Sequence, residues 1–175
     1  QSAMNKKSNH AGFRYIHDRF GSNFRMTEIQ SCIGRIQLRN LNKINKLRTR
    51  NAMILTKEIR ELEFIRAPLP CEKYTHAWYK FHCYLKHEKF KFGWDRNRII
   101  SEIKANGYPA FHGSCSEIYL EKCFKERGFT PAQRLTNAKL LGERSLMFLV
   151  HNTINLDDMY NYSKRIKQIL KTAFN

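Results

Sequence analysis

The apolar residues near the N-terminal end of the chain recur at helical spacing. Four of them fall at i, i+3, i+4 and i+7: Ile29, Cys32, Ile33 and Ile36. This periodicity is typical of one stripe along an amphipathic helix. Thr27 and Gln30 stand just before it with the spacing of a capping box, in which the threonine hydroxyl and the glutamine side chain each bond a free backbone amide. We therefore expect a helix that begins at Thr27.

A second helical pattern follows over residues 41–62. Asn40 and Asn42 stand between the two patterns, and we expect a bend there. The apolar positions of the second helix are Leu41, Ile44, Leu47, Met53, Ile54, Leu55, Ile59 and Leu62. Its other face is basic, as expected for a solvated surface. Pro68 and Pro70 mark the end of this helical region.

The rest of the chain alternates between strand and helix patterns. We expect three strands, over 77–85, over 108–111 and, as a buried strand, over 145–150. Two helices lie between the second and third strands, one capped by Ser116 and ending at Gly128 and one starting at Pro131. A helix capped by Asp95 and closed by Asn106-Gly107 comes after the first strand, and a last helix starts at Asp157 or Asp158. The strands are few and separated by helices, which indicates an α/β or α+β layer domain with a few-stranded sheet. The pattern leaves strand direction open.

The chain has 175 residues and a formal net charge of +17, from 32 Lys and Arg against 15 Asp and Glu. This length suits one domain or a fragment of a larger protein. The hydrophobic share of 42% and aromatic share of 13% exclude a disordered polycation. No apolar run approaches the roughly 20 residues that span a bilayer, and no signal-peptide core is present. We therefore expect a cytoplasmic protein with no membrane partner.

The charge invites a nucleic-acid hypothesis. Four aromatic residues in the strand over 77–85 could form a stacking platform in a basic groove: Trp78, Tyr79, Phe81 and Tyr84. Two features oppose this alternative. The aromatic residues alternate with basic ones as in a half-buried strand, and the basic residues are spread over every predicted helix. We therefore expect no nucleic-acid partner.

Motifs for catalysis or metal binding are missing. The five cysteines are scattered without a Cys-x-x-Cys pair, and no His-x-x-x-His pair exists, so we expect reduced thiols and no metal site. Phosphate-binding and dinucleotide-binding glycine motifs are likewise absent. Cys115 stands in a polar, turn-like stretch where a nucleophile is conceivable, but a structural role explains it better. The residues alone identify no catalytic group.

One polar stretch stands directly before the first helix: Gly-Ser-Asn-Phe-Arg-Met-Thr-Glu-Ile-Gln over residues 21–30. The Asn23 amide is a neutral donor and the Arg25 guanidinium a fixed fork of donors, and both suit an anionic group. An ordinary helix entry with a buried arginine explains the same residues slightly better on chemistry alone.

This stretch resembles the Gly-x-Asn-(Tyr/Phe)-Arg-Met signature of the DegT/StrS family, pyridoxal-phosphate (PLP) aminotransferases that act on nucleotide-linked keto-sugars. The segments 76–81, 113–119 and 145–151 follow in the order of the family's C-terminal half. The resemblance implies the small C-terminal domain of an aspartate-aminotransferase-type fold. On that basis residues 1–3 are interpreted as a tag remnant, 4–20 as a lead-in segment and 21–175 as the domain.

The resemblance also implies roles for individual residues. Asn23 matches the asparagine that binds the phosphate of the partner subunit's PLP across a dimer interface. Arg25 matches the arginine of the same motif, where a role at the cofactor or substrate site and a structural ion pair are both open. His112, Tyr119 and His151 fall in segments that approach the sugar nucleotide, although packing explains each of them as well.

The family's Schiff-base lysine belongs to a motif upstream of this signature. Lys6 and Lys7 have no context that would lower a lysine pKa, so neither is assigned as catalytic. We therefore expect the chain alone to bind no PLP and to be inactive. Its partner would be a second copy or a missing N-terminal large domain. Three origins stay open: an expressed C-terminal domain, one half of a split enzyme, or the remnant of a broken gene.

Overall fold

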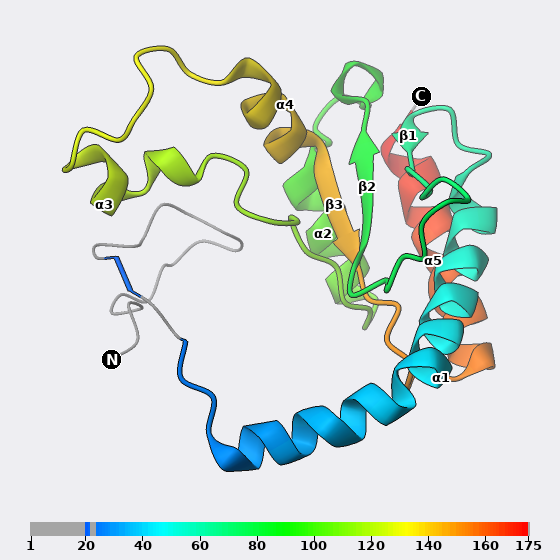
Figure 1. The fold of residues 1–175 in the computed structure, drawn as a ribbon. Helices are drawn as coiled ribbons and strands as arrows, with labels where there is room; N and C mark the ends of the chain where they lie inside the picture. The colour runs from blue at the N-terminus through cyan, green and yellow to red at the C-terminus, as the bar shows by residue number, and fades with distance from the viewer. Residues whose placement is uncertain (1–19, 22–23, 175) are drawn as a thin grey trace.

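The computed structural model describes residues 20–21 and 24–174, which form a small α/β domain (Figure 1). Its elements, in chain order, are α1 (Glu28–Ile59), β1 (Ile65–Arg66), β2 (Phe81–Leu85), α2 (Arg96–Ala105), α3 (Lys122–Lys125), α4 (Thr136–Arg144), β3 (Ser145–Phe148) and α5 (Leu156–Ala173). The predicted class, a few-stranded sheet packed with helices, is confirmed.

The sheet has three strands in the order β1-β2-β3, and both pairings are antiparallel. Phe81 lies opposite Phe148, and Ile65 lies opposite Leu85. All four residues of β3 are buried, as expected for the short apolar run over 145–150. The two residues of β1 are too few to give an alternating pattern, which explains why the sequence did not predict this strand.

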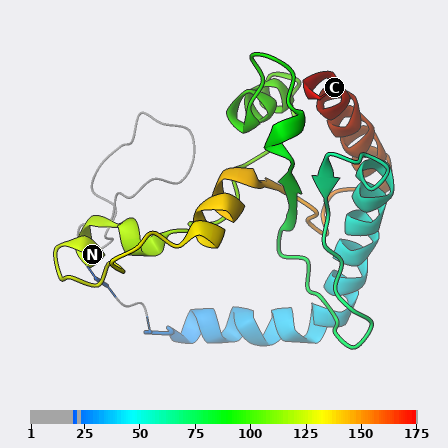
Figure 2. The same ribbon diagram turned by 90° about the horizontal axis from the view of Figure 1, so that it is seen from above.

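The hydrophobic core lies between the sheet, α2, α5 and the second half of α1. Its fully buried side chains include Leu55, Ile59, Phe81, Phe148 and Ile166. Helices α1 and α5 run side by side along the core, as both views of the ribbon show (Figures 1 and 2). The first half of α1 continues beyond this contact and projects away from the sheet.

Helix α1 begins as predicted and is continuous from Glu28 to Ile59, although its two halves run in different directions (Figures 1 and 2). Thr27 Oγ1 accepts from the Gln30 amide and Gln30 Oε1 from the Thr27 amide, which confirms the capping box. The sequence predicted two helical segments with a bend near Asn40 and Asn42; the structure has a single helix that changes direction without a break. The Asn40 side chain donates to the Ile36 carbonyl at 3.2 Å, one turn earlier, so it satisfies its amide within a continuous helix.

The other helix starts were predicted with mixed success. Asp95 caps α2 by accepting from the Arg98 amide at 2.7 Å, as predicted. The last helix is capped by Asn155, two residues before the predicted start. The helix predicted from Pro131 begins only at Thr136. The helix predicted from Ser116 to Gly128 is wrong, because a 3-10 turn over Ile118–Leu120 and the short α3 replace it.

Three predicted strands are shorter than expected. The strand over 145–150 ends at Phe148. The strand over 77–85 begins only at Phe81, because Trp78 has a φ of 48° that breaks the extended run. The Trp78 amide donates to His76 Nδ1 at 2.9 Å, and its indole is buried in the core. The strand over 108–111 reduces to a single bridge between Phe111 and Met147.

Residues 113–135 form an excursion from the sheet that we name the α3 arm. The arm and the first half of α1 project to the same side of the core in both views (Figures 1 and 2). Glycines allow the base of the arm to pack closely. A Cβ on Gly142 of α4 would overlap Ser116 Oγ and lie 2.7 Å from Ser116 Cβ. Gly113 has a φ of 99°, and a Cβ added to it would overlap Ser145 Oγ.

Because the two halves of α1 differ in burial, truncating an apolar side chain should lower the unfolding free energy by different amounts in each half. Leu55→Ala removes a fully buried side chain and should cost about 2–5 kcal/mol of unfolding free energy. Ile33→Ala removes one that is 53% exposed and should change that energy by less than about 0.5 kcal/mol. Urea unfolding of both variants measures the difference. Equal losses would show that the first half of α1 is packed in the free chain.

The close packing of the α3 arm on α4 predicts a penalty at Gly142. Gly142→Ala should lower the unfolding free energy by about 1–3 kcal/mol, because the new methyl displaces Ser116 and outweighs the gain in helix propensity. Gly34→Ala in α1 is the matched control, since nothing lies within 4 Å of its added Cβ. That control should be neutral or stabilising in the same urea titration. A neutral Gly142→Ala would contradict the packing.

Candidate functional site

A polar cavity of about 160 Å³ lies between the base of the α3 arm, α4 and the start of α2. Its lining residues are Arg96, His112, Ser114, Cys115, Ser116, Glu117, Arg134, Lys139, Gly142 and Glu143. Arginine and lysine side chains, a histidine and two serine hydroxyls therefore border one small space. Such donors suit a ligand that carries oxygen-rich or anionic groups.

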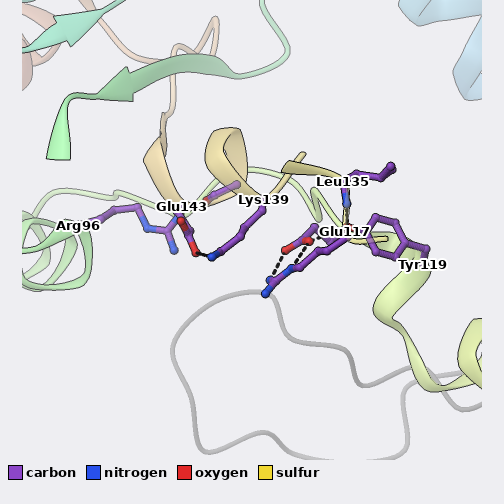
Figure 3. A network of polar contacts seen from close by, with 8 residues as sticks. Arg96, Glu117, Tyr119, Leu135, Lys139 and Glu143 are labelled. Atoms are coloured by element: carbon purple, nitrogen blue, oxygen red, sulfur yellow. Dashed lines mark hydrogen bonds and ion pairs between the residues drawn. The ribbon is translucent and has the colours of Figure 1, made fainter. Parts of the chain in front are cut away.

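Glu117 is the central group of this cavity, although it is only 3% exposed. Arg134 donates to its two carboxylate oxygens through Nε and a terminal nitrogen, each at 2.7 Å (Figure 3). The Tyr119 hydroxyl donates to Glu117 Oε1 at 2.7 Å as well. A two-point arginine–carboxylate contact fixes orientation as well as charge, and removing one member of a buried pair is costly.

Tyr119 is buried, and its hydroxyl is part of the same hydrogen-bond network. Its hydroxyl accepts from the Leu135 amide at 3.0 Å, and its carbonyl accepts from Thr130 Oγ1 at 3.0 Å. Burial and the hydrogen bond to Glu117 raise the pKa of the phenol. The side chain therefore stays neutral at physiological pH and joins the two ends of the α3 arm. Its predicted contact with substrate stays a prediction.

His112 lines the same cavity, where its Nε2 lies 2.8 Å from Asn97 Oδ1. Beside it, Arg96 donates to the Gly142 carbonyl and, at 3.4 Å, to the Ser145 carbonyl. These are carbonyls at the C-terminal end of α4, where a cation is favourable. Lys139 Nζ lies 3.8 Å from Oε1 of Glu143, one turn later in α4 (Figure 3).

The other predicted site residues lie elsewhere. His151 follows β3, where its Nδ1 lies 2.8 Å from Thr153 Oγ1 and it does not line the cavity. Arg25 is exposed on the extended segment before α1, so the interpretation as a buried arginine is wrong. Asn23 lies outside the described residues. The structure thus brings His112 and Tyr119 into one loop and leaves His151 apart from them.

Sequence reasoning missed Glu117, Arg134, Arg96 and Lys139 as members of one cavity. They come from three different elements far apart in the chain, and no motif spacing connects them. The one available signal was Glu117, an acidic residue in a chain with only 15 acids. The sequence pattern instead places Glu117 in the first turn of the helix predicted from Ser116.

Cys115 also lines the cavity, and its environment opposes a nucleophilic role. Burial, and then the nearby charge of Glu121, raise the pKa of its thiol. Its Sγ lies 3.9 Å from Glu121 Oε1. A raised pKa keeps the thiol protonated and weakly reactive. All five cysteines are free thiols. Among the described residues, no group of three His, Cys, Asp or Glu is arranged to hold a metal ion.

The aromatic residues considered for nucleic-acid stacking do not form a platform. Trp78 and Phe81 are buried in the core, at 5% and 0% exposure, while Tyr79 is 74% exposed and Tyr84 is partly buried. This is the half-buried alternation that the sequence predicted. No helix in the described part of the chain is long and apolar enough to cross a bilayer.

A second, apolar hollow runs along the first half of α1. Its volume is about 610 Å³, and its lining is Met26, Ser31, Gly34, Arg35, Gln37, Leu38, Leu41, Ile44 and Arg48. On the same helix half, Ile29, Ile33 and Ile36 are 74%, 53% and 50% exposed. The predicted apolar stripe is therefore present, but in this chain it faces solvent.

Comparison with known proteins gives both a family and a length difference. The family model described as DegT/DnrJ/EryC1/StrS aminotransferase matches residues 3–167. A solved aminotransferase from Psychrobacter cryohalolentis is 39% identical and superposes with a TM-score of 0.81, over 96% of this chain and 45% of that one. PseC of Helicobacter pylori, an aminotransferase involved in pseudoaminic acid biosynthesis, superposes with a TM-score of 0.72 at 19% identity, over 97% of this chain and 43% of that one.

The curated relative MJ1066 of Methanocaldococcus jannaschii is 22% identical over 171 residues, which is 97% of this chain and 43% of that protein. This chain therefore spans less than half the length of the proteins it matches. The family match covers most of the 175 residues, and the 39% identity to an aminotransferase extends over nearly all of them. The chain belongs to the DegT/DnrJ/EryC1/StrS aminotransferase family.

Proposed function

We propose that this chain is the C-terminal part of a PLP-dependent aminotransferase that acts on nucleotide-linked keto-sugars in polysaccharide or related sugar biosynthesis. In the proposal it forms part of the substrate site and of a dimer interface. The observation that carries it is the exposed apolar first half of α1. This observation accompanies 39% identity to an aminotransferase of more than twice the length.

The exposed stripe of α1 indicates a missing partner. Burying apolar surface is worth about 25 cal/mol per Å², so a row of solvent-facing isoleucines forgoes substantial stabilisation. Ile29 at 74% exposure stands at the start of the row, and the hollow beside Leu38 and Leu41 continues it. Contiguous apolar surface of this kind marks interaction sites. The proposed occupant is the N-terminal large domain, in the same chain or in a separate subunit, with a second copy as the alternative.

The residues before α1 fit the phosphate of PLP. Arg25 is exposed beside the N-terminal end of α1, and Asn23 supplies an amide in the same short segment. Both side chains donate hydrogen bonds and suit a phosphate. The family uses PLP, which when bound supplies the electron sink for amino transfer. The proposed task of Asn23 is to hold that phosphate, with Arg25 at the wall of the same site.

The Schiff-base lysine is proposed to belong to the N-terminal domain. A nucleophilic lysine needs a lowered pKa, from burial or a neighbouring cation. The pKa of Lys167 is shifted in the opposite direction: it is raised, first by the hydrogen bond to Glu61 and also by that to Glu58. An ammonium stabilised by two carboxylates is unsuited to attack a cofactor. The chain alone is therefore proposed to be inactive.

The polar cavity supports an oxygen-rich substrate. His112, Arg96 and Lys139 border it together with the hydroxyls of Ser114 and Ser116. Such groups bind the phosphates and hydroxyls of a sugar nucleotide. His112 and Tyr119 are proposed to serve this end of the site. His151 follows the C-terminal end of β3 and would act apart from this cavity.

A chimaera tests the proposed function. This chain would replace the matching C-terminal part of the Psychrobacter cryohalolentis aminotransferase. We expect the chimaera to bind PLP, seen as its absorbance, and to transfer an amino group to a nucleotide-linked keto-sugar, whereas the isolated chain should do neither. Asn23→Ala should weaken PLP affinity about tenfold or more, since a hydrogen bond to a charged group is worth about 1.5–3 kcal/mol.

Asn40→Ala is the matched control, because the Asn40 side chain bonds only within α1 in the described structure. It should leave PLP affinity unchanged. A folded chimaera that stays colourless and inert would contradict the proposal. Salt-dependent binding of oligonucleotides by the isolated chain, falling steeply with ionic strength, would favour the nucleic-acid alternative instead.

A further inference from the structure

The outer face of the sheet carries a further hollow, which we name the hydroxyl hollow. In β2 the side chains of Phe81, Cys83 and Leu85 are buried in the core, so His82 and Tyr84 lie on the opposite face. The hollow has a volume of about 290 Å³. Its lining comes from β2, the start of β3, α4 and the base of the α3 arm: His82, Tyr84, Ser114, Ser116, Leu141, Gly142 and Ser145.

Most of these side chains can form hydrogen bonds that the protein does not supply. In the described part of the chain, no side-chain hydrogen bond is made by the imidazole of His82, the phenol of Tyr84 or the hydroxyls of Ser114, Ser116 and Ser145. Ser145 is only 6% exposed, and buried polar groups normally have a partner. Five unsatisfied polar side chains around one hollow indicate a site that a ligand completes.

The polar groups are held in place before any ligand arrives. The Arg66 guanidinium lies 4.5 Å from the centroid of the Tyr84 ring. A Cβ on Gly113 would overlap Ser145 Oγ and lie 3.6 Å from His82 Nδ1, so this glycine lets the base of the α3 arm come close to both groups. Sites for small molecules are usually preformed in this way.

The lining of the hydroxyl hollow is uncharged. Among the described residues that line it, none is an acid, a lysine or an arginine. Burial, and then the nearby charge of Lys80, lower the pKa of His82, so its imidazole is neutral at physiological pH and offers one donor and one acceptor. Serine and tyrosine hydroxyls also both donate and accept. Such groups match the hydroxyls of an uncharged ligand.

The hydroxyl hollow and the polar cavity share a wall. Ser114, Ser116 and Gly142 line both of them. On the far side of this wall the polar cavity is bordered by cations, among them Arg96 and Lys139, which favour an anion. A ligand that fits the two spaces together therefore has an anionic group bonded to an uncharged group rich in hydroxyls.

We propose that the hydroxyl hollow binds the uncharged ring of a sugar whose attached phosphate lies in the polar cavity. His82, Tyr84 and Ser145 bond the ring hydroxyls, and the phosphate lies toward Lys139. The inference rests on the proposed function, in which the substrate is a nucleotide-linked sugar. It adds the residues of the outer sheet face that hold the sugar ring.

Three probes of the 175-residue chain test this arrangement: inorganic phosphate, glucose and glucose 1-phosphate. Amide chemical shifts are followed during titration of each probe. Phosphate should shift the amide of Lys139, whereas glucose 1-phosphate should also shift those of Tyr84 and Ser145. It should bind about tenfold more tightly than phosphate, because hydrogen bonds to the ring add to the phosphate contacts. Equal affinities, shifts confined to the polar cavity, or no binding at millimolar concentration would each overturn the proposal.

Two substitutions each remove a single hydroxyl from the hollow. Ser145→Ala and Tyr84→Phe should each weaken glucose 1-phosphate binding about two- to tenfold and leave phosphate affinity unchanged. Ser101→Ala and Tyr79→Phe are the matched controls, because both side chains are exposed away from the hollow. Unchanged affinity for glucose 1-phosphate in both variants would overturn the proposal, and so would an equal loss of phosphate affinity. If Ser145→Ala does not fold, Tyr84→Phe decides.

The chimaera separates this inference from the proposed function. A colourless, inert chimaera would contradict the proposed function, and the titrations of the isolated chain would still decide the sugar site. In an active chimaera, Tyr84→Phe should raise the KM for the nucleotide-linked keto-sugar about two- to tenfold. An unchanged KM would overturn the sugar site while the proposed function stands.

Discussion

The geometry of the domain depends on one buried junction between α1 and the turn after β3. Asn51 is fully buried in the second half of α1, and its amide nitrogen donates to the His151 carbonyl at 2.8 Å and to the Ile154 carbonyl at 3.4 Å. Arg50 donates to Asn51 Oδ1 and also to the Ile154 carbonyl at 3.2 Å. Buried polar groups that are satisfied in this way specify a single arrangement. The junction sets the angle at which α1 leaves the core.

Helix α1 is continuous but changes direction between its halves, so the junction and this change of direction together determine where its first half lies (Figures 1 and 2). Phe20 contacts Phe124 at the tip of the α3 arm, and Thr27 caps the start of α1. The arm is in turn fixed at its base by Glu117 and by the close approach of Ser116 to Gly142. The core thus supports two projections, the first half of α1 and the α3 arm.

Local signals predicted the parts of the fold that are decided locally. The capping box at Thr27, the cap at Asp95 and the buried strand from Ser145 depend on neighbours in sequence, and the structure confirms them. The α3 arm was mispredicted as a helix because its shape depends on long-range contacts, chiefly Glu117 with Arg134. The polar cavity escaped prediction for the same reason. The solvent exposure of Ile29 and Ile33 depends on which other segments pack against α1, and periodicity does not reveal that.

The central claim is that the first half of α1 is an interface for the N-terminal part of a larger enzyme. Cys32 lies on this half and is exposed, and Cys71 is exposed outside α1, so the chain carries its own probe and reference. The direct measurement is the alkylation rate of both thiols, in the isolated chain and in the chimaera. The account predicts that Cys32 reacts freely in the isolated chain and is protected in the chimaera, while Cys71 changes little. Equal reactivity of Cys32 in both proteins would contradict it.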